Sequence, residues 1–294
     1  MNHQAFITDL DGTLLRSDQT LSPYTLETID SALQQDVVVT FATARGYVSA
    51  MQVVADIPWK YPLILYNGAL IYDGLEGTVI DGYWLDYKIS NDIIRIGRKH
   101  GLTPFYFSLD TDHRERVLHE TLCREGETAF YQSRMNDPRF MEVAALQCPE
   151  SHRTLALTYI GLLDELEPIR REVNDCFGDV VHAHMMPDYY IRNHYFLEFS
   201  HVNGNKGDGL RLWAAHMGIP LRNTVVFGDH LNDLGLFEAG GTRIAVRNAH
   251  ERIQKLADQV VDSNDADGVA NYIRKQLEVI GTEDEVQLDA GLKP

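Results

Sequence analysis

The sequence has little that would mark an exported, disulfide-linked or nucleic-acid-binding protein. Its three cysteines are widely spaced and contain no CxxC pair, which favours reduced thiols over a disulfide framework or a zinc site. Positive charge is scarce, because 26 Lys and Arg against 43 Asp and Glu leave a net charge of −17. No run of basic residues interrupts that balance, so nucleic acid and anionic membranes are disfavoured as partners.

Long apolar runs are also missing. No window of about 18 apolar residues occurs, so no membrane-spanning helix is predicted. The start of the chain, MNHQAFITDLDG, has neither a basic segment nor the long apolar stretch of an export signal. We therefore expect a cytoplasmic protein whose partners are small solutes or proteins.

What the sequence does contain is an alternation of strands and helices at both ends. An apolar run at 5–8 predicts a strand, and Ser22 with Pro23 predicts the start of a helix that ends near residue 35. A β-branched run at 37–40 and a further run to about residue 66 predict two more strands, the second followed by a turn at Asn67 and Gly68. Strands alternating with helices indicate an α/β fold with a parallel sheet.

The same alternation returns near the C-terminus, whereas the middle differs. A helix is predicted at 206–217 and a strand at 224–227, followed by further short strands and helices. Residues 82–200 contain two helical patterns and several aromatic-rich strands, which indicates an inserted α+β domain with an antiparallel sheet. We therefore expect a discontinuous core domain (1–81 and 201–294) around this insertion, with a frayed polar tail at about 281–294.

Polar residues follow several of the predicted strands. Asp9 and Asp11 lie directly behind the first strand, and an isolated DLDGT of this kind is typical of an ordinary turn. Thr43 follows a second strand, Lys206 begins a helix, and GDHLND (228–233) follows a third strand. Because ligands bind at the carboxyl ends of the strands in such sheets, this combination predicts a site there.

The residue types at that edge suit one kind of chemistry. Asp9, Asp11 and Asp229 offer oxygen ligands without a neighbouring Cys or ligating His, which favours Mg²⁺ over zinc. The Thr43 hydroxyl, the Lys206 ammonium and loop N–H groups are suitable donors to a phosphate. Two carboxylates at i and i+2 can divide nucleophilic attack and proton transfer between them.

These segments carry a family resemblance. DLDGTLL, FATARG, Lys206 and GDHLND resemble, in order, the four motifs of the haloacid dehalogenase (HAD) superfamily of phosphatases. YNGALI, RIAVRNA and VVDSNDADGVANYI resemble its Cof-type, type IIB subgroup. The resemblance implies a Rossmann-like parallel-sheet core, an inserted α+β cap of type C2B, and Mg²⁺-dependent hydrolysis of small phosphorylated metabolites.

The resemblance also implies a role for each matching residue. Asp9 would be the nucleophile and a metal ligand, Asp11 the general acid/base that lends its backbone carbonyl to the metal, and Asp229 the remaining metal ligand. Asp233 would support Lys206 or the metal. The phosphate would be held by Leu10, Thr43, Ala44, Lys206 and Asn232. Ala44 departs from the family pattern, which usually has Gly there, and a backbone conformation that needs Gly would disturb the loop.

Several alternatives stay open at this stage. A phosphomutase would share the motifs, a phosphometabolite sensor would bind without turnover, and a signalling receiver domain would place its acidic pair differently. Arg45 either lies near the substrate or pairs with an acidic neighbour. His182 and His184 lie on one side of a predicted strand, which is more typical of a strand surface than of a metal site.

Overall fold

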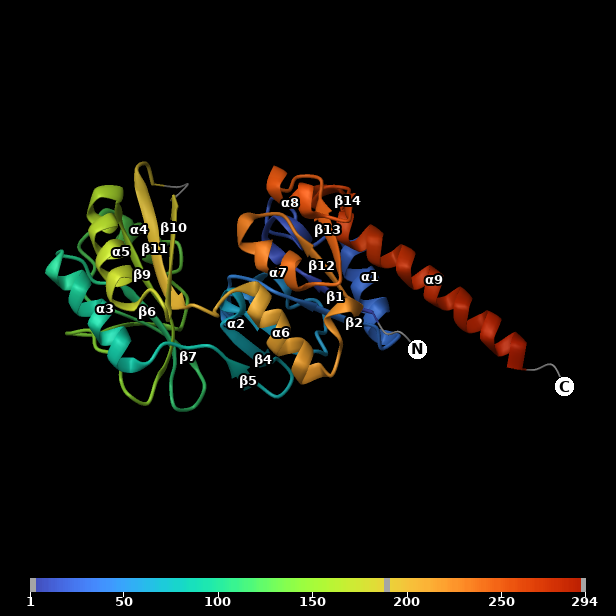
Figure 1. Cartoon of the computed structure of the whole chain (residues 1–294), viewed down its shortest axis with the longest axis horizontal. Coiled ribbons are helices and arrows are strands. Elements are labelled where there is room, and N and C mark those ends of the chain that lie inside the picture. The colour runs from blue at the N-terminus through green and yellow to red at the C-terminus, as the bar shows by residue number, and fades with distance from the viewer. Residues whose placement is uncertain (1–3, 188–190, 292–294) are drawn as a thin grey trace. The chain divides into compact units, whose positions relative to one another are not determined.

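The computed structural model describes residues 4–187 and 191–291, without the side chains of 280–291. The chain divides into a core unit, residues 1–81 with 205–294, and an inserted unit, residues 82–204 (Figure 1). The return to the core was predicted at residue 201, which is the last residue of β11 (His194–His201). That strand is still paired with the inserted unit's sheet at His201, opposite Val181, so the chain leaves the sheet only afterwards.

The core unit is built on a five-stranded parallel sheet in the order β14-β13-β12-β1-β2. Its first strand along the chain, β1, pairs with neighbours on both sides, since Ile7 lies opposite both Val226 and Thr40. The apolar residues Ala5 to Ile7 are fully buried, as expected of a parallel strand covered on both faces. The strands are β1 (Ala5–Thr8), β2 (Val38–Phe41), β12 (Thr224–Gly228), β13 (Thr242–Val246) and β14 (Gln259–Val261).

Helices connect these strands, and local sequence signals mark the start of the first helix and the end of α6. The Ser22 hydroxyl caps the first helix by accepting the Thr25 N–H at 2.9 Å, and Gly218 ends α6 in the left-handed conformation. The helices are α1 (Pro23–Gln34), α2 (Tyr47–Val54), α6 (Lys206–Met217), α7 (Leu234–Ala239), α8 (Glu251–Leu256) and α9 (Gly268–Gly291). No helix in the described part of the chain has the length and apolarity to cross a bilayer.

The last helix extends further than the sequence predicted. α9 packs beside α1 and continues to Gly291, over most of the segment expected to be frayed (Figure 1). Between 282 and 290 there is no Gly or Pro, and Glu, Gln, Leu and Ala all favour helix. The rest of the predicted tail, 292–294, lies outside the described residues.

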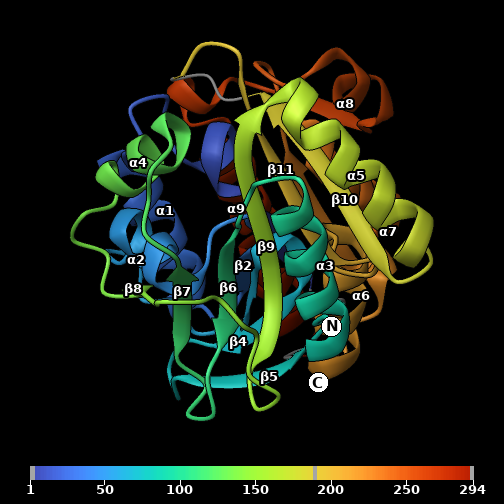
Figure 2. The same cartoon turned by 90° about the vertical axis from the view of Figure 1, so that its left-hand side faces the viewer.

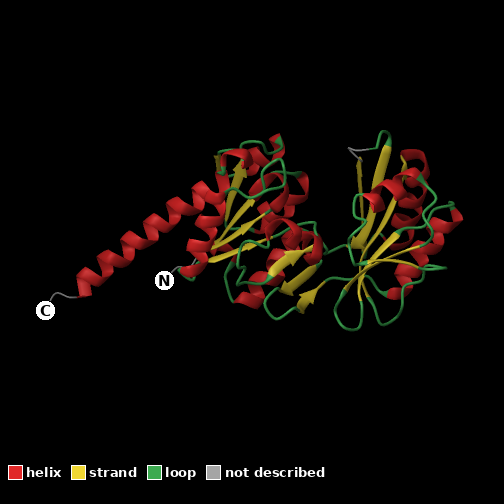
Figure 3. Cartoon of the chain, turned by 180° about the vertical axis from the view of Figure 1, so that it is seen from behind, coloured by secondary structure: helices red, strands yellow, loops and turns green. Residues whose placement is uncertain are grey.

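A second, smaller sheet lies beside the parallel one in the core unit. It contains β3 (Leu63–Leu65), β4 (Leu70–Asp73) and β5 (Thr78–Gly82), and β3 pairs antiparallel with β4 (Figure 3). The sequence predicted the run before residue 66 as another strand of the parallel sheet. Positive φ angles at Tyr66, Asn67 and Gly68 reverse the chain after β3, which pairs with β4 in this separate sheet. An isolated parallel bridge from Ala42 to Ile64 and a hydrogen bond from the Thr43 N–H to the Ile64 carbonyl link β3 to the segment that follows β2.

The inserted unit is built on a six-stranded sheet in the order β10-β11-β9-β6-β7-β8. Its pairs are antiparallel except β7 with β8, so the sheet is mixed and the antiparallel prediction was wrong at this edge. The remaining elements of the unit are α3 (Tyr87–Lys99), β6 (Phe105–Leu109), β7 (Glu115–His119), α4 (Glu125–Gln132), β8 (Phe140–Glu142), β9 (Arg153–Leu162), α5 (Leu163–Phe177) and β10 (Val181–Pro187).

Both faces of this mixed sheet carry an apolar cluster. Tyr106 and Leu118 belong to the main cluster, which the neighbouring helices α3 and α5 cover (Figure 2). Phe105 and Val117, the adjacent residues on the same strands, belong to a second cluster that includes Phe130 of α4. Successive side chains of a strand point to opposite faces, so the two clusters lie on opposite sides of the sheet.

Candidate functional site

The predicted site residues follow the carboxyl ends of three neighbouring parallel strands. Asp9 comes directly after β1, Thr43 follows β2, and Asp229 comes directly after β12. These strands are adjacent in the order β12-β1-β2, with β1 in the middle. The sheet therefore brings together residues that lie more than two hundred positions apart, as the Thr13 to Asp229 hydrogen bond shows.

Lys206, the first residue of α6, connects two of the acidic residues. Its side chain is fully buried, and its Nζ donates to Asp9 Oδ1 at 2.6 Å and to Asp233 Oδ1 at 2.6 Å. Burial by itself would lower the pKa of Lys206, but the facing carboxylates of Asp233 and Asp9 outweigh it and raise the pKa. The lysine is therefore a fixed positive charge.

The loop after β12 is held by Asp233. Its Oδ2 accepts the backbone N–H of Asp229 at 3.0 Å and that of His230 at 3.1 Å. Together with Lys206, these donors engage both oxygens of Asp233. The fully buried Asp233 side chain therefore fixes both the lysine and the backbone that carries Asp229.

Asp229 is held from the opposite side by the loop that follows Asp9. The Thr13 hydroxyl donates to Asp229 Oδ1 at 3.1 Å. Gly12 has a φ of +76°, and a Cβ on it would lie 2.5 Å from Asp229 Oδ2. Glycine is thus required here both for the turn and for the close approach of the carboxylate.

Asp9, Asp229 and Asp233 form an acidic cluster with carboxylate oxygens within 4.8 Å of one another. The lysine is the only cation that contacts the cluster among the described residues, so three carboxylates face one ammonium. Burial raises the pKa of Asp9 well above its usual range and also raises that of Asp229, with Asp233 adding to both shifts. A divalent cation fits this site, because all the donors are oxygens and the negative charge is only partly offset.

The structure places Asp11 outside this cluster. Its carboxylate accepts two hydrogen bonds from Arg45, one from Nη2 at 2.6 Å and one from Nε at 2.8 Å. Of the two open interpretations of Arg45, the structure therefore shows pairing with an acidic neighbour. The sequence placed the Asp11 carboxylate with those of Asp9 and Asp229. In the structure, the third carboxylate of the cluster is that of Asp233.

The predicted phosphate-binding groups lie on the surrounding loops. Within the described part of the chain, the N–H groups of Leu10 and Ala44 donate no hydrogen bond. Thr43 is buried, and its hydroxyl accepts the N–H of Arg45 at 3.1 Å. Ala44 has no positive φ, so this loop forms without glycine and the departure from the family pattern causes no strain.

Some neighbours of the site had a sequence signal that was not used. Asn232 donates from Nδ2 to Asn67 Oδ1 at 3.3 Å, and Asn67 belongs to a turn that the sequence did predict. Asn248 donates to the Gly12 carbonyl at 2.7 Å, and it follows β13 at the same edge of the sheet. Applying the strand-end criterion to every strand would have identified Asn248.

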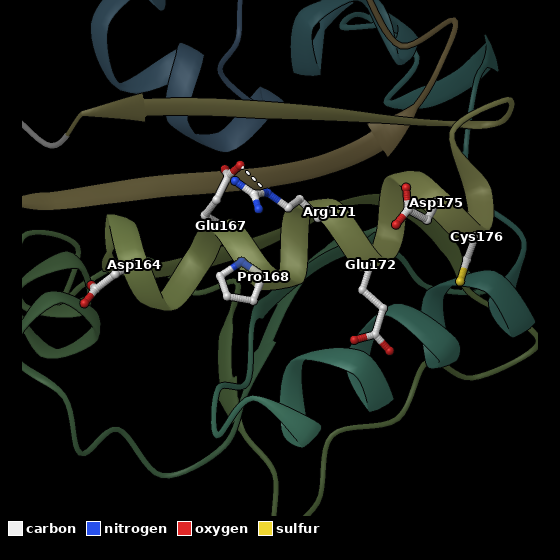
Figure 4. A pocket seen from close by; sticks show the side chains of 7 residues that line it. All are labelled: Asp164, Glu167, Pro168, Arg171, Glu172, Asp175 and Cys176. Atoms are coloured by element: carbon white, nitrogen blue, oxygen red, sulfur yellow. Dashed lines mark hydrogen bonds and ion pairs between the residues drawn. The ribbon is translucent and has the colours of Figure 1, made fainter.

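Two other features of the inserted unit contain none of these residues. A cavity of about 550 Å³ lies along α5 and is lined by Asp164, Glu167, Pro168, Arg171, Glu172, Asp175 and Cys176 (Figure 4). His182 and His184 lie on β10 with ring centroids 6.2 Å apart. Among the described residues they form no group of three with another His, Cys, Asp or Glu that could hold a metal ion.

Comparison with known proteins extends these observations to the whole chain. It is 24% identical over 277 residues to the pyridoxal phosphate phosphatase of Escherichia coli, a match that covers 94% of this chain and 100% of the relative. It is 23% identical over 273 residues to the 5-amino-6-(5-phospho-D-ribitylamino)uracil phosphatase of Bacillus subtilis, a match that covers 91% of this chain and 95% of the relative.

A solved structure shares the fold. The crystal structure of a haloacid dehalogenase-like hydrolase from Bacteroides thetaiotaomicron matches with a TM-score of 0.75 and 21% identity, covering 93% of this chain and 99% of that one. The family model for haloacid dehalogenase-like hydrolases matches residues 6–273, which include both core segments and the insertion between them. The chain therefore belongs to the haloacid dehalogenase-like hydrolases.

Proposed function

We propose that this phosphatase is Mg²⁺-dependent and hydrolyses small phosphate monoesters through a phosphoaspartate formed on Asp9. The observation that carries the proposal is the buried Lys206, which holds Asp9 and Asp233 beside Asp229 at the carboxyl ends of the strands. This arrangement combines a fixed positive charge, a cation site and a carboxylate with one oxygen that receives no hydrogen bond from a described residue.

The residues of the chain account for both halves of the reaction. Lys206 engages Oδ1 of Asp9, so Oδ2 is the oxygen available to attack phosphorus. As the bond from phosphorus to the ester oxygen breaks, Asp11 gives a proton to that oxygen and the alcohol leaves. Asp11 then takes a proton from the water that attacks the phosphoaspartate, which releases inorganic phosphate and restores Asp9.

The donor set indicates how Mg²⁺ would be held. Both oxygens of Asp233 are engaged by Lys206 and by backbone N–H groups, whereas Asp229 Oδ2 has no described donor and Asp9 Oδ1 accepts a single hydrogen bond, from Lys206, which leaves it a lone pair for a cation. Asp9 and Asp229 would therefore be the carboxylate ligands, with the Asp11 backbone carbonyl as a third, and Asp233 would support them. When bound, the cation would offset the charge of the carboxylates and of the phosphate.

The phosphate would be bound by groups that the surrounding loops leave available. The N–H groups of Leu10 and Ala44 have no described acceptor, and the Lys206 ammonium provides the positive charge. The Thr43 hydroxyl and the Asn232 amide complete the donors. Neutral donors with a single cation suit a dianion already bound beside Mg²⁺.

The class of substrate is supported by the relatives. One acts on pyridoxal phosphate and another on a phosphoribitylamino uracil, and both are phosphorylated small molecules. We propose sugar phosphates or related phosphometabolites as substrates here, and the inserted unit as the cap that selects the leaving group. The core residues assigned above would bind the cation and the phosphate and move the proton, so we expect discrimination between metabolites to come from the inserted unit.

Phosphate release from a panel of phosphometabolites, with and without Mg²⁺, tests this proposal beside Asp9→Asn. The wild type should release phosphate only with the cation, and the variant should release none while keeping its circular dichroism spectrum. Tight binding of a metabolite without turnover would instead establish the sensor alternative. A requirement for a sugar bisphosphate would establish the phosphomutase.

A further inference from the structure

We infer that Arg45 is a positioning residue for Asp11, and that it fixes the carboxylate of the acid/base in one orientation. The inference rests on the proposed function, since it concerns the group that would move the proton. Asp11 is the one residue that the proposed mechanism assigns to proton transfer. The inference adds Arg45, which belongs to the second of the four motifs, FATARG.

The geometry of the pair is that of a planar fork. The Nε and Nη2 of Arg45 contact the two different oxygens of Asp11, at 2.8 and 2.6 Å. Two parallel charge-assisted hydrogen bonds fix direction as well as distance, which a lysine ammonium cannot do. The carboxylate plane of Asp11 is therefore set by the guanidinium plane.

Asp11 has little else to orient it. Its side chain is 48% exposed, and no other described side chain donates a hydrogen bond to it. It is followed directly by Gly12, which has a positive φ. Without Arg45, a half-exposed carboxylate on this turn would sample several rotamers.

Arg45 itself is held firmly. Its side chain is only 18% exposed, and Nη2 also donates to Gln19 Oε1 at 3.1 Å. Its N–H donates to the Thr43 hydroxyl, and its carbonyl accepts the Tyr66 N–H at 3.0 Å. These hydrogen bonds fix the Arg45 backbone within the loop that follows β2. The position of the guanidinium, and with it that of the Asp11 carboxylate, therefore depends on this loop.

The competing interpretation is that Arg45 binds the substrate directly. Against it, Nη1 contacts the Ser49 carbonyl at 3.4 Å, and the other nitrogens are engaged by Asp11 and Gln19. A substrate would have to displace these partners. The two roles differ in kinetics, because a substrate-binding arginine changes KM and a positioning arginine changes kcat.

The test uses the leaving group. An alkyl alcohol needs a proton to leave, whereas p-nitrophenolate leaves as an anion, so only the alkyl ester depends strongly on the acid. Arg45→Met should lower the single-turnover rate of alcohol release from the best alkyl phosphate of the panel by roughly tenfold to a hundredfold, the size expected for a misplaced catalytic group. This rate does not include the later attack of water, so the loss in single-turnover release of p-nitrophenolate should be much smaller, and KM for the alkyl ester should stay near the wild-type value.

Two further variants separate positioning from folding. In an Asp11→Asn background, adding Arg45→Met should cause no further loss, because the arginine acts through the carboxylate. Arg16→Met is the matched control, since Arg16 pairs with Asp267 at 2.8 Å and contacts no residue of the acidic cluster. It should leave the ratio of the two activities unchanged. Arg45→Lys keeps the charge without the fork and should fall between wild type and Arg45→Met.

The outcomes are distinguishable. A rise in KM alone, equal losses on both esters, or additive losses in the Asp11→Asn background would each overturn the positioning role while leaving the phosphatase intact. A wild-type enzyme that hydrolyses neither ester with Mg²⁺ would instead overturn the proposed function. Should Arg45→Met fail to fold, the ratio measured for Arg45→Lys decides the question.

Discussion

Replacing Lys206 by Met tests whether the lysine neutralises charge that would otherwise be unpaired in the interior. Met keeps much of the apolar stem of Lys206 and removes the ammonium. The side chains of Asp9 and Asp233 are 7% and 0% exposed, so water cannot take the place of the lost cation. Removing one partner of a buried ion pair typically costs about 3–5 kcal/mol. We expect a loss of that size in the free energy of unfolding near neutral pH and without Mg²⁺.

Urea denaturation followed by tryptophan fluorescence measures this loss. Trp213 is fully buried on the same helix as Lys206, so its emission reports the unfolding of this region. The matched control is Lys60→Met, because Lys60 is 42% exposed and lies 3.4 Å from Asp36. An exposed pair of this kind is typically worth less than about 1 kcal/mol.

Two further results would follow from the same reasoning. Lys206→Met with Asp233→Asn should recover part of the loss, because one unpaired carboxylate is gone. The loss of stability caused by Lys206→Met should also be smaller in acid. Without Lys206, nothing offsets the effect of burial on the pKa of Asp9, so this carboxyl is protonated more readily as the pH falls. A protonated Asp9 has no charge left unpaired. A deficit below about 1 kcal/mol, or one equal to that of Lys60→Met, would refute the charge argument.

Three other predictions concern the acidic cluster. Mg²⁺ at a hundred times its dissociation constant should stabilise the protein by about 2.7 kcal/mol in thermal denaturation, and Asp229→Asn should abolish that gain. Without Mg²⁺, the stability of the wild type relative to an Asp9→Asn, Asp229→Asn double variant should rise as the pH falls from neutral, because the folded-state pKa values of Asp9 and Asp229 lie above their unfolded values; a difference with the opposite slope in denaturation at several pH values would contradict the assignment. Gly12→Ala should cost roughly 1–2 kcal/mol from its positive φ and should weaken Mg²⁺ binding measured by calorimetry, because the new methyl group would meet Asp229 Oδ2; unchanged affinity would argue against Asp229 as a ligand.

Local signals in the sequence predicted much of the core. The apolar run at 5–8 and the Ser22 cap were identified because each depends only on neighbouring residues. The gathering of Asp9, Lys206 and Asp229 followed from topology, since parallel strands end at one edge of a sheet. The region of β7, α4 and β8 was missed, because short segments with charged residues such as Glu115 and Arg116 show neither period clearly.

Side-chain partners were harder to predict than positions. Asp11 lies nearer in sequence to a strand end than Asp233 does, yet Asp233 joins the cluster and Asp11 pairs with Arg45. The difference comes from contacts between loops, which no local pattern encodes. The turn at Asn67 and Gly68 was predicted, but the positive φ of +49° at Tyr66 was not, because a tyrosine is held there by tertiary structure and not by its own preference.

The division of the core into two chain segments affects the order in which the protein can fold during synthesis. β1 is an inner strand of its sheet, paired on both sides, and one of its two partners, β12, begins only at Thr224. At about 5–20 residues per second, the ribosome needs roughly 10–40 s to produce that partner. The inserted unit is continuous and can complete its own sheet first. Until β12 has been synthesised, one edge of the apolar strand Ala5–Thr8 has no partner. We therefore expect chaperones to bind the nascent chain during this time.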